Sequence, residues 1–288
     1  MRKRNILSGI MLLIGIVLIL YPFILNYITE KDQAKVITDY QSEVEVLTQS
    51  QKNEKIENAE KYNNELSKDI QVDVSLDETE EENKDYLNML DIGNTMGYIS
   101  IPRIKVELPI YHGTSDNVLK NGVGHLEGTS LPIGGKNTHC VLAGHTGLAS
   151  GKIFDNIDKL EFGDIFYIKV LDKTLEYKVV NIIKVDPNDT EAIKLDSEKD
   201  YVTLVTCTPR LINSHRLLVR GERVQDEKSS TTNEEFEKIE PSSQKVITTE
   251  ENSFKTIIKG DKKIYIILGS ILILIVIFIC SHIFIKNH

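Results

Sequence analysis

The hydrophobic positions of this chain include two long uninterrupted runs, at residues 5–29 and 264–285. The first run contains no charged residue, and His282 is the one ionisable side chain of the second. A helix rises about 1.5 Å per residue, so about 20 apolar residues cross the roughly 30 Å hydrocarbon core of a bilayer. The pattern therefore predicts two transmembrane helices that flank the rest of the chain.

The first run is predicted to remain as an uncleaved anchor. A secretory signal peptide has a shorter apolar core that ends at a cleavage site of small residues, whereas this run continues through Tyr-Pro-Phe-Ile-Leu at 21–25. Three basic residues at 2–4 place the tail 1–4 in the cytoplasm, so the chain between the runs lies outside and the tail 286–288 returns inside. Lysines at 255–263 favour the opposite orientation, and we expect the first span to dominate them.

Residues 30–90 are predicted to form a helical stalk followed by an acidic segment. The first part lacks glycine and proline, and apolar residues recur at spacings of three and four, as on one face of a helix: Ile37, Tyr40, Val44 and Leu47. The stretch 73–85 carries seven acidic residues and one lysine. Like charges repel one another and little apolar area is available for burial, so we predict a solvated surface segment there.

Between residues 91 and 225 the pattern changes to short β-type runs separated by glycine, proline and asparagine. The runs are 98–111, 138–145, 165–171, 175–185, 201–207 and 215–224. Strands at this density, with brief helical candidates such as 151–160, are typical of a closed or sandwiched β fold. We predict a mainly β fold, a closed barrel of about eight strands over 91–225, with 226–263 as a polar linker to the second span.

Charge and motif content exclude some classes of function. The chain has 43 acidic against 34 basic residues and a net charge of −9, which is the wrong sign for neutralising nucleic-acid phosphates. Nucleic acid is therefore not expected as a partner. The sequence has neither a glycine-rich phosphate loop nor the paired Cys and His spacing of a zinc site, so no cofactor and no metal are expected.

Three cysteines are present, and Cys280 falls in the second apolar run, where it is interpreted as a packing residue. Cys140 and Cys207 fall in the predicted barrel. A disulfide between them is one alternative, because such pairs are common outside the cytoplasm, but it requires Cα atoms within about 7 Å of each other. The other alternative is a free thiol that takes part in a reaction.

Cys207 ends one β-type run, and the next run resumes at His215. If the two strands pair antiparallel, Cys207 and Arg216 face each other, whereas His215 points to the opposite face. A fixed cation favours the thiolate and can donate to a developing oxyanion. A cysteine nucleophile also needs a proton carrier, and His145 at the end of another strand is a candidate, with His112 and His125 as competitors.

Two motifs around these positions resemble the sortases, the cysteine transpeptidases of Gram-positive surfaces. One is Thr-Leu-Val-Thr-Cys at 203–207 with Arg216 nine residues on, and the other is Gly-His-Thr-Gly-Leu at 144–148. Within the family the chain is most similar to class C, the pilus-assembling group, which shares the two-span layout. The resemblance extends over about 86–224, with further matching stretches at 96–102, 108–113, 122–135, 206–209 and 215–221.

The resemblance implies a role for each candidate residue. Cys207 is the expected nucleophile that forms an acyl-thioester, His145 the general acid and base, and Arg216 the residue that positions the substrate or stabilises the oxyanion. Arg220 shares the strand face of Arg216 and is at most a supporting residue. His125 lies in a family-like stretch and is interpreted as structural.

One departure from class C concerns the lid that usually covers the site through an Asp-Pro-aromatic motif. No proline occurs between Pro22 and Pro102, so that motif is missing. Asp73 is the candidate replacement for its aspartate, with Asp77 as a second choice. The solvated surface segment described above is the alternative to a lid.

The resemblance also implies the reaction and its partners. A pilin or surface-protein precursor with an LPXTG-like sorting signal presents its Thr-Gly bond to Cys207, and a lysine amine of another pilin subunit accepts the acyl group. The membrane is the other expected partner. One alternative is a sortase that attaches surface proteins to cell-wall peptide. A second is a non-catalytic, membrane-tethered β-domain that binds a surface partner, in which Cys207 is a buried apolar residue.

Overall fold

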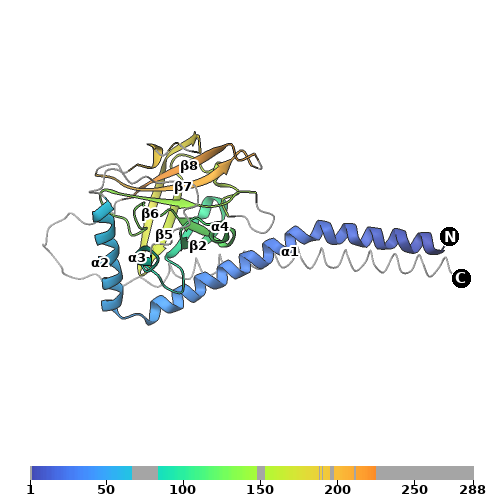
Figure 1. The fold of residues 1–288 in the computed structure, drawn as a ribbon, viewed down its shortest axis with the longest axis horizontal. Coiled ribbons are helices and arrows are strands. Elements are labelled where there is room, and N and C mark those ends of the chain that lie inside the picture. Colours follow the sequence, from blue (N-terminus) through green and yellow to red (C-terminus); the bar gives the residue numbers. More distant parts are fainter. Residues whose placement is uncertain are drawn as a thin grey trace, which may run out of the picture. The chain divides into compact units, whose positions relative to one another are not determined.

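The computed structural model describes residues 2–66, 84–147, 153–187, 189, 191–194, 198–210 and 212–224 (Figure 1). Helices α1 (Arg2–Val46), α2 (Gln49–Leu66) and α3 (Lys84–Leu87) come first. The strands are β1 (Gly97–Ile101), β2 (Val106–His112), β3 (Val123–His125), β4 (Thr138–Ala143), β5 (Ile165–Val170), β6 (Lys173–Val185), β7 (Asp200–Thr208) and β8 (His215–Arg223). Short helices between strands are η1 (Pro102–Ile104), α4 (Asp116–Asn121), η2 (Ile157–Lys159) and η3 (Glu191–Ile193).

The eight strands close into a barrel in the order β1-β2-β3-β4-β7-β8-β6-β5. Strand β2 runs parallel to β3 and β4 runs parallel to β7, while the other neighbours are antiparallel. Closure leaves no unpaired sheet edge. The predicted closed barrel of about eight strands is confirmed.

Two details of the barrel differ from the runs read in the sequence. The run 98–111 contains two strands, because Pro102 has no backbone N–H and begins η1, and Lys105 takes a left-handed conformation with φ 54° that turns the chain back. Ile101 then pairs with Val106. Strand β3 is only three residues long and includes a glycine, so no alternating pattern marks it.

The strands separate two apolar clusters, one on each face of the sheet. Phe166, Ile168 and Val170 of β5 are fully buried and point into the barrel interior, as do Val202 and Leu204 of β7. Because successive strand residues point to opposite faces, Val205 lies on the outer face. There it joins a smaller group that we call the outer apolar cluster: Leu126, Val141, Ile193, Val205 and Leu218.

The predicted helical face near the start of the chain packs on the barrel. Ile37, Tyr40 and Val44 of α1 are buried against Ile92 and Tyr98. The helix ends at Val46, and the next helix begins after a capping box in which the Thr48 hydroxyl accepts from the Gln51 amide N–H while the Gln51 side chain accepts from the Thr48 amide N–H, at 3.3 and 2.9 Å. The region predicted as a helical stalk thus contains the end of α1 and all of α2, which meet at a sharp turn (Figure 1).

Helix α2 is fixed to the barrel domain by a buried asparagine. The Asn63 side chain donates to the Leu131 carbonyl at 3.3 Å and accepts from the Leu131 amide at 2.7 Å. Both backbone groups of Leu131 are thereby satisfied, as they would be by a neighbouring strand. Ala59, one turn earlier, is also completely buried, so this face of α2 is part of the core.

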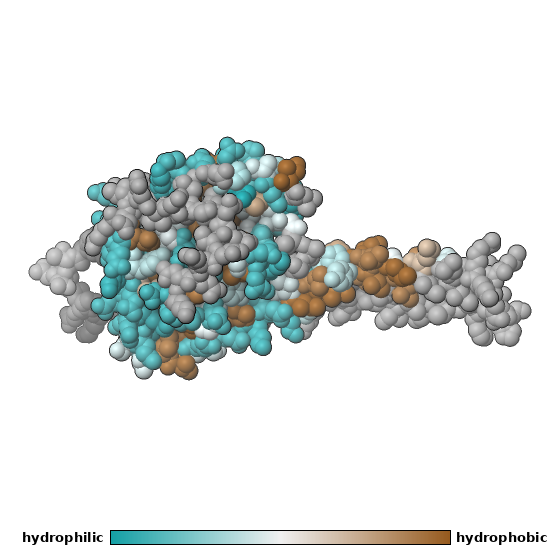
Figure 2. All heavy atoms as spheres, in the orientation of Figure 1, coloured by the Kyte–Doolittle hydropathy of each residue, from teal (hydrophilic) through white to brown (hydrophobic). Residues whose placement is uncertain are grey.

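The first part of α1 presents exposed apolar side chains to its surroundings, and Figure 2 shows groups of brown spheres along the helix with paler residues between them. Within the described residues, the one helix with the length and composition to cross a membrane is Met11–Val46, with a mean hydropathy of 2.3 in its most apolar window. This helix fits a membrane anchor. The predicted linker 226–263, second span 264–285 and tail 286–288, together with Asp73 and Asp77, lie outside the described residues.

Candidate active site

Cys207 and Arg216 lie directly opposite each other on the antiparallel strands β7 and β8. The next pair along the ladder is Thr208 with His215. Opposed residues on paired strands project from the same face, so the thiol and the guanidinium share one side of the sheet. Cys207 is half-buried, whereas the six residues before it are buried, which places the thiol where the strand emerges from the core.

His145 follows the last residue of β4, which runs parallel to β7. Ala143 pairs with Val205, the Gly144 amide donates to the Val205 carbonyl at 3.0 Å, and the Thr206 hydroxyl donates to the Gly144 carbonyl at 2.6 Å. Continued by two residues beyond the end of β4, this register places His145 beside Cys207. Both then belong to the outer face, next to the outer apolar cluster.

Gly144, the residue before His145, has to be glycine because the Phe154 ring packs directly against it. A Cβ on Gly144 would lie 2.6 Å from the Phe154 ring, a distance that side chains do not tolerate. Phe154 is fully buried, and its amide donates to the His145 carbonyl at 3.0 Å. The end of β4 is thus held by close packing on one side and by backbone hydrogen bonds on the other.

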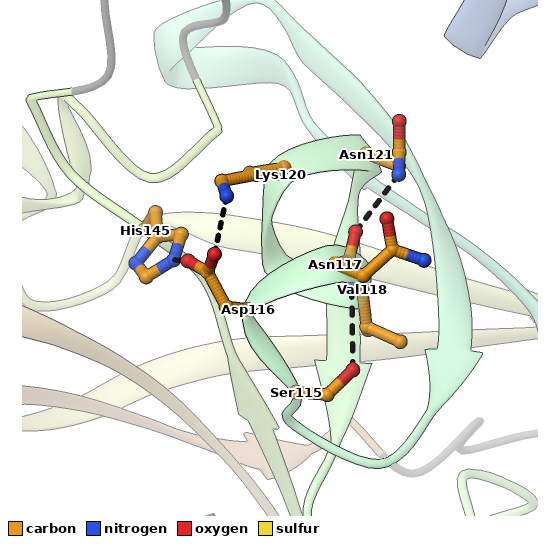
Figure 3. A network of polar contacts seen from close by, with 7 residues as sticks. All are labelled: Ser115, Asp116, Asn117, Val118, Lys120, Asn121 and His145. Atoms are coloured by element: carbon orange, nitrogen blue, oxygen red, sulfur yellow. Dashed lines mark hydrogen bonds and ion pairs between the residues drawn. The ribbon is translucent and has the colours of Figure 1, made fainter.

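The His145 ring is directed toward helix α4, as Figure 3 shows. Its Nε2 lies 3.2 Å from Oδ1 of Asp116, and the His145 side chain is 28% exposed. The other oxygen of Asp116 accepts from Lys120, one turn later in the helix. Hydrogen bonds from Lys120 and from His145 lower the pKa of the Asp116 carboxyl below its usual range.

Arg216 is held near its own turn. Its Nη1 lies 3.4 Å from the Asn213 carbonyl and 3.5 Å from the His215 carbonyl, at the upper limit for hydrogen bonds. Contacts of this length are easily exchanged. The remaining guanidinium donors are available, in geometry, for an oxygen near Cys207.

Asp155 connects the two loops that follow His145 and Cys207. Its carboxylate accepts from the Gly147 amide at 2.6 Å and from the Thr146 hydroxyl at 3.4 Å, and it is only 11% exposed. From the second loop, Arg210 donates to the Asp155 carbonyl at 2.6 Å and lies 3.5 Å from the carboxylate. Sequence reasoning missed both Asp155 and Asp116, since neither belongs to a recognisable local motif.

The two competing histidines are engaged in the interior. His125 is completely buried, with Nε2 donating to the Ser130 carbonyl at 2.9 Å and Nδ1 2.8 Å from the Tyr86 hydroxyl. Burial lowers the pKa of His125 to about 4. His112 donates from Nε2 to the Met89 carbonyl at 2.7 Å, and burial lowers its pKa as well. The ring nitrogens of His125 are thus committed to structural contacts.

Arg220 and Cys140 lie apart from this group of residues. The Arg220 guanidinium donates to the Ala192 carbonyl and lies 5.0 Å from the centre of the Tyr201 ring, so it fastens η3 to the barrel. Cys140 is opposite Val202 in the interior, and burial raises its pKa well above the ordinary value. Cys140 and Cys207 are both free thiols, and no disulfide joins them.

The arrangement brings a thiol, an imidazole and a guanidinium together at the ends of three strands. This combination suits nucleophilic acyl transfer, in which a thiolate attacks, an imidazole carries the proton and a cation stabilises the oxyanion. Within the part of the chain that the structure describes, no group of three or more His, Cys, Asp or Glu side chains is arranged to hold a metal ion.

Comparison with known proteins places this geometry in a family. Residues 99–224 match the family model described as a sortase domain. Sortase A of Listeria monocytogenes is 30% identical over 229 residues, which cover 79% of this chain and 94% of that protein. Sortase A of Bacillus anthracis is 33% identical over 135 residues, which cover 47% of this chain. The chain spans less than two thirds of that relative, at 62% of its length.

Solved structures agree with the sequence comparison. The sortase C1 of GBS pilus island 1 is 37% identical with a TM-score of 0.62, and the match covers 70% of this chain and 96% of that one. The likeness therefore extends beyond the barrel motifs to most of the described fold.

Proposed function

The chain belongs to the sortase family of cysteine transpeptidases, and we propose that it is a class C member that joins pilin subunits through Cys207, His145 and Arg216. The observation that carries the proposal is the placement of these residues at adjacent strand ends, with Cys207 opposite Arg216 and His145 two residues beyond the end of the parallel β4–β7 pairing. The similarity to sortases C, one of them from a pilus island, supports the class.

The first half of the reaction forms a thioester. The Cys207 thiolate attacks the threonine carbonyl carbon at the Thr-Gly bond of an LPXTG-like sorting signal, and Arg216 donates to the carbonyl oxygen as it gains negative charge. The C–N bond then breaks, and His145 gives its proton to the departing glycine amine. The acyl group remains on the Cys207 sulfur.

The second half transfers the acyl group to an amine. A lysine amine of another pilin subunit attacks the thioester carbonyl, an isopeptide bond forms and the C–S bond breaks. The amine's proton passes to His145, and the Cys207 thiolate is regenerated. No oxidant, reductant or nucleotide is consumed, because one acyl bond is exchanged for another.

The membrane arrangement follows from the apolar runs. We propose that residues 5–29 and 264–285 both span the membrane, with tails 1–4 and 286–288 in the cytoplasm and the catalytic barrel, 91–225, outside a Gram-positive cell. Residues 30–90 and 226–263 then connect the barrel to its two anchors. Double anchoring keeps the enzyme near membrane-tethered precursors and raises their effective concentration.

The proposal is tested by incubating the full chain in detergent with an LPXTG-type peptide and a lysine-bearing acceptor, followed by mass spectrometry. The expected product is the peptide cleaved after threonine and joined to the lysine amine, absent with Cys207→Ala. A product joined only to a cell-wall peptide amine identifies the wall-anchoring alternative. Product that persists in Cys207→Ala overturns the proposal, and binding of the peptide without cleavage by the unchanged chain identifies a non-catalytic binding domain.

A further inference from the structure

Helix α4 carries a carboxylate that contacts the proposed proton carrier. Asp116 lies in the first turn of the helix, and its Oδ1 is 3.2 Å from Nε2 of His145 at the end of β4 (Figure 3). A carboxylate at neutral pH only accepts hydrogen bonds, so Nε2 must carry the proton in this contact. The contact joins two elements that are 29 positions apart in the chain.

The position of Asp116 is fixed from several sides. The Ser115 hydroxyl caps α4 by accepting from the Val118 amide at 3.4 Å, and Lys120 binds the second carboxylate oxygen. Gln33 of α1 donates to the Asn121 carbonyl at 3.0 Å, which ties the far end of the short helix. The carboxylate is therefore presented to His145 by a supported element and not by a free side chain on an open loop.

We propose that Asp116 is a positioning residue for His145, which holds Nε2–H, sets the ring orientation and leaves Nδ1 to exchange protons with substrate. The inference rests on the proposed function, because it concerns His145, the general acid of that proposal. In this way a surface aspartate acts on the chemistry without touching the substrate.

Lys120 modifies this effect, because it shares the Asp116 carboxylate with His145. Lys120 holds the second carboxylate oxygen, which leaves Oδ1 of Asp116 directed at the His145 ring. Lys120→Gln is therefore expected to loosen the carboxylate and to weaken the same contact, by less than Asp116→Ala.

The test uses the full chain in detergent with five variants: Asp116→Ala, Asp116→Asn, Asp116→Glu, Lys120→Gln and Asp158→Asn. Asp158 is an exposed aspartate of η2 and serves as the matched control. For Asp116→Ala we expect kcat for peptide cleavage to fall about tenfold with KM within about twofold, since proton transfer is impaired and binding is not. Asp116→Glu should recover most of the loss, and Asp158→Asn should change nothing.

A second readout follows the His145 ring itself, through the ring nitrogen chemical shifts of histidine-labelled protein, which report which nitrogen carries the proton. In the unchanged protein the neutral ring should carry its proton on Nε2, and in Asp116→Ala the share of the form protonated on Nδ1 should rise. Unchanged kcat and an unchanged tautomer in Asp116→Ala would overturn the inference. An equal change of tautomer in Asp158→Asn would do so too, because it indicates a general disturbance of the protein.

The two readouts separate this inference from the proposed function. The ring nitrogen shifts need no turnover, so they test the Asp116–His145 contact even if the unchanged protein cleaves no peptide. Normal cleavage by the unchanged protein together with a fully active Asp116→Ala leaves the transpeptidase proposal standing and removes the role of Asp116.

Discussion

Cys207 and Arg216 are direct cross-strand partners, and each is half-buried and lies next to the buried residues of its strand. The Arg216 guanidinium makes only long contacts with the Asn213 and His215 carbonyls, which are weak enough to be replaced by an oxyanion. Under the proposed function, the pairing keeps this donor on the same face of the sheet as the thiol, where it would stabilise the negative charge of the transition state.

Arg216→Ala should lower kcat for peptide cleavage by about 100-fold or more, because an oxyanion donor is lost. Arg216→Lys should recover only part of this, since an ammonium keeps the charge but not the planar fork of donors. Steady-state kinetics with a fluorogenic sorting-signal peptide measures both. Equal activity of the lysine variant and the unchanged protein would argue against a geometric role for the guanidinium.

His125 should make the protein less stable in acid. Its pKa is about 4 in the fold and about 6.5 in an unfolded chain, so between these pH values the unfolded state binds the extra proton. Stability is fully present above about pH 6.5 and is lost as pH falls toward 4, by about 3 kcal/mol for this one group. Urea unfolding from pH 7 to 4 measures the slope, which should become shallower in His125→Gln even though that variant is less stable at pH 7.

Replacing Asp155 should lower the free energy of unfolding more than replacing its partner Arg210. Asp155→Ala leaves the Gly147 amide without its acceptor in a largely buried place, and we expect the free energy of unfolding to fall by about 1–2 kcal/mol. Arg210 is half exposed, so Arg210→Ala should cost below about 0.5 kcal/mol. Urea unfolding of the two variants and of the double variant checks this. A larger loss from Arg210→Ala would show that the ion pair, not the amide contact, holds the loops.

Gly144→Ala should displace the end of β4 that carries His145. The added methyl group would lie 2.6 Å from the Phe154 ring, and overpacking of this kind costs about 1–3 kcal/mol. We expect lower stability together with lower kcat. Combining it with Phe154→Leu, which trims the ring, should recover part of both losses, and a failure of that rescue would contradict steric overlap as the cause.

The sequence predicted the barrel and the helical face because both follow from local periodicity. The alternation in β5 and the three- and four-residue spacing of Ile37, Tyr40 and Val44 are each visible within one short window. The pairing of Cys207 with Arg216 was also predictable, since only six residues, 209–214, separate the end of β7 from the start of β8 in a simple hairpin. Strand β3, at three residues, was too short to leave such a pattern.

Contacts between distant loops could not be predicted in the same way. Asp116 meets His145 across 29 positions and Asp155 meets Arg210 across 55, and each pair depends on how the barrel brings separate connections together. From the sequence alone, Asp116 is interpreted as an ordinary acidic residue in the first turn of a helix, and Asp155 as a charged residue of a surface loop. Only the fold shows that both carboxylates face the residues that follow β4.

The central claim is that Cys207 carries the acyl group, and intact-mass spectrometry of the full chain after brief exposure to an LPXTG-type peptide tests it most directly. The account predicts a mass increase equal to the acyl fragment ending at threonine, located on Cys207, reversed by hydroxylamine and absent in Cys207→Ala. A stable acyl adduct on another residue, or peptide cleavage that persists in Cys207→Ala, would contradict the account.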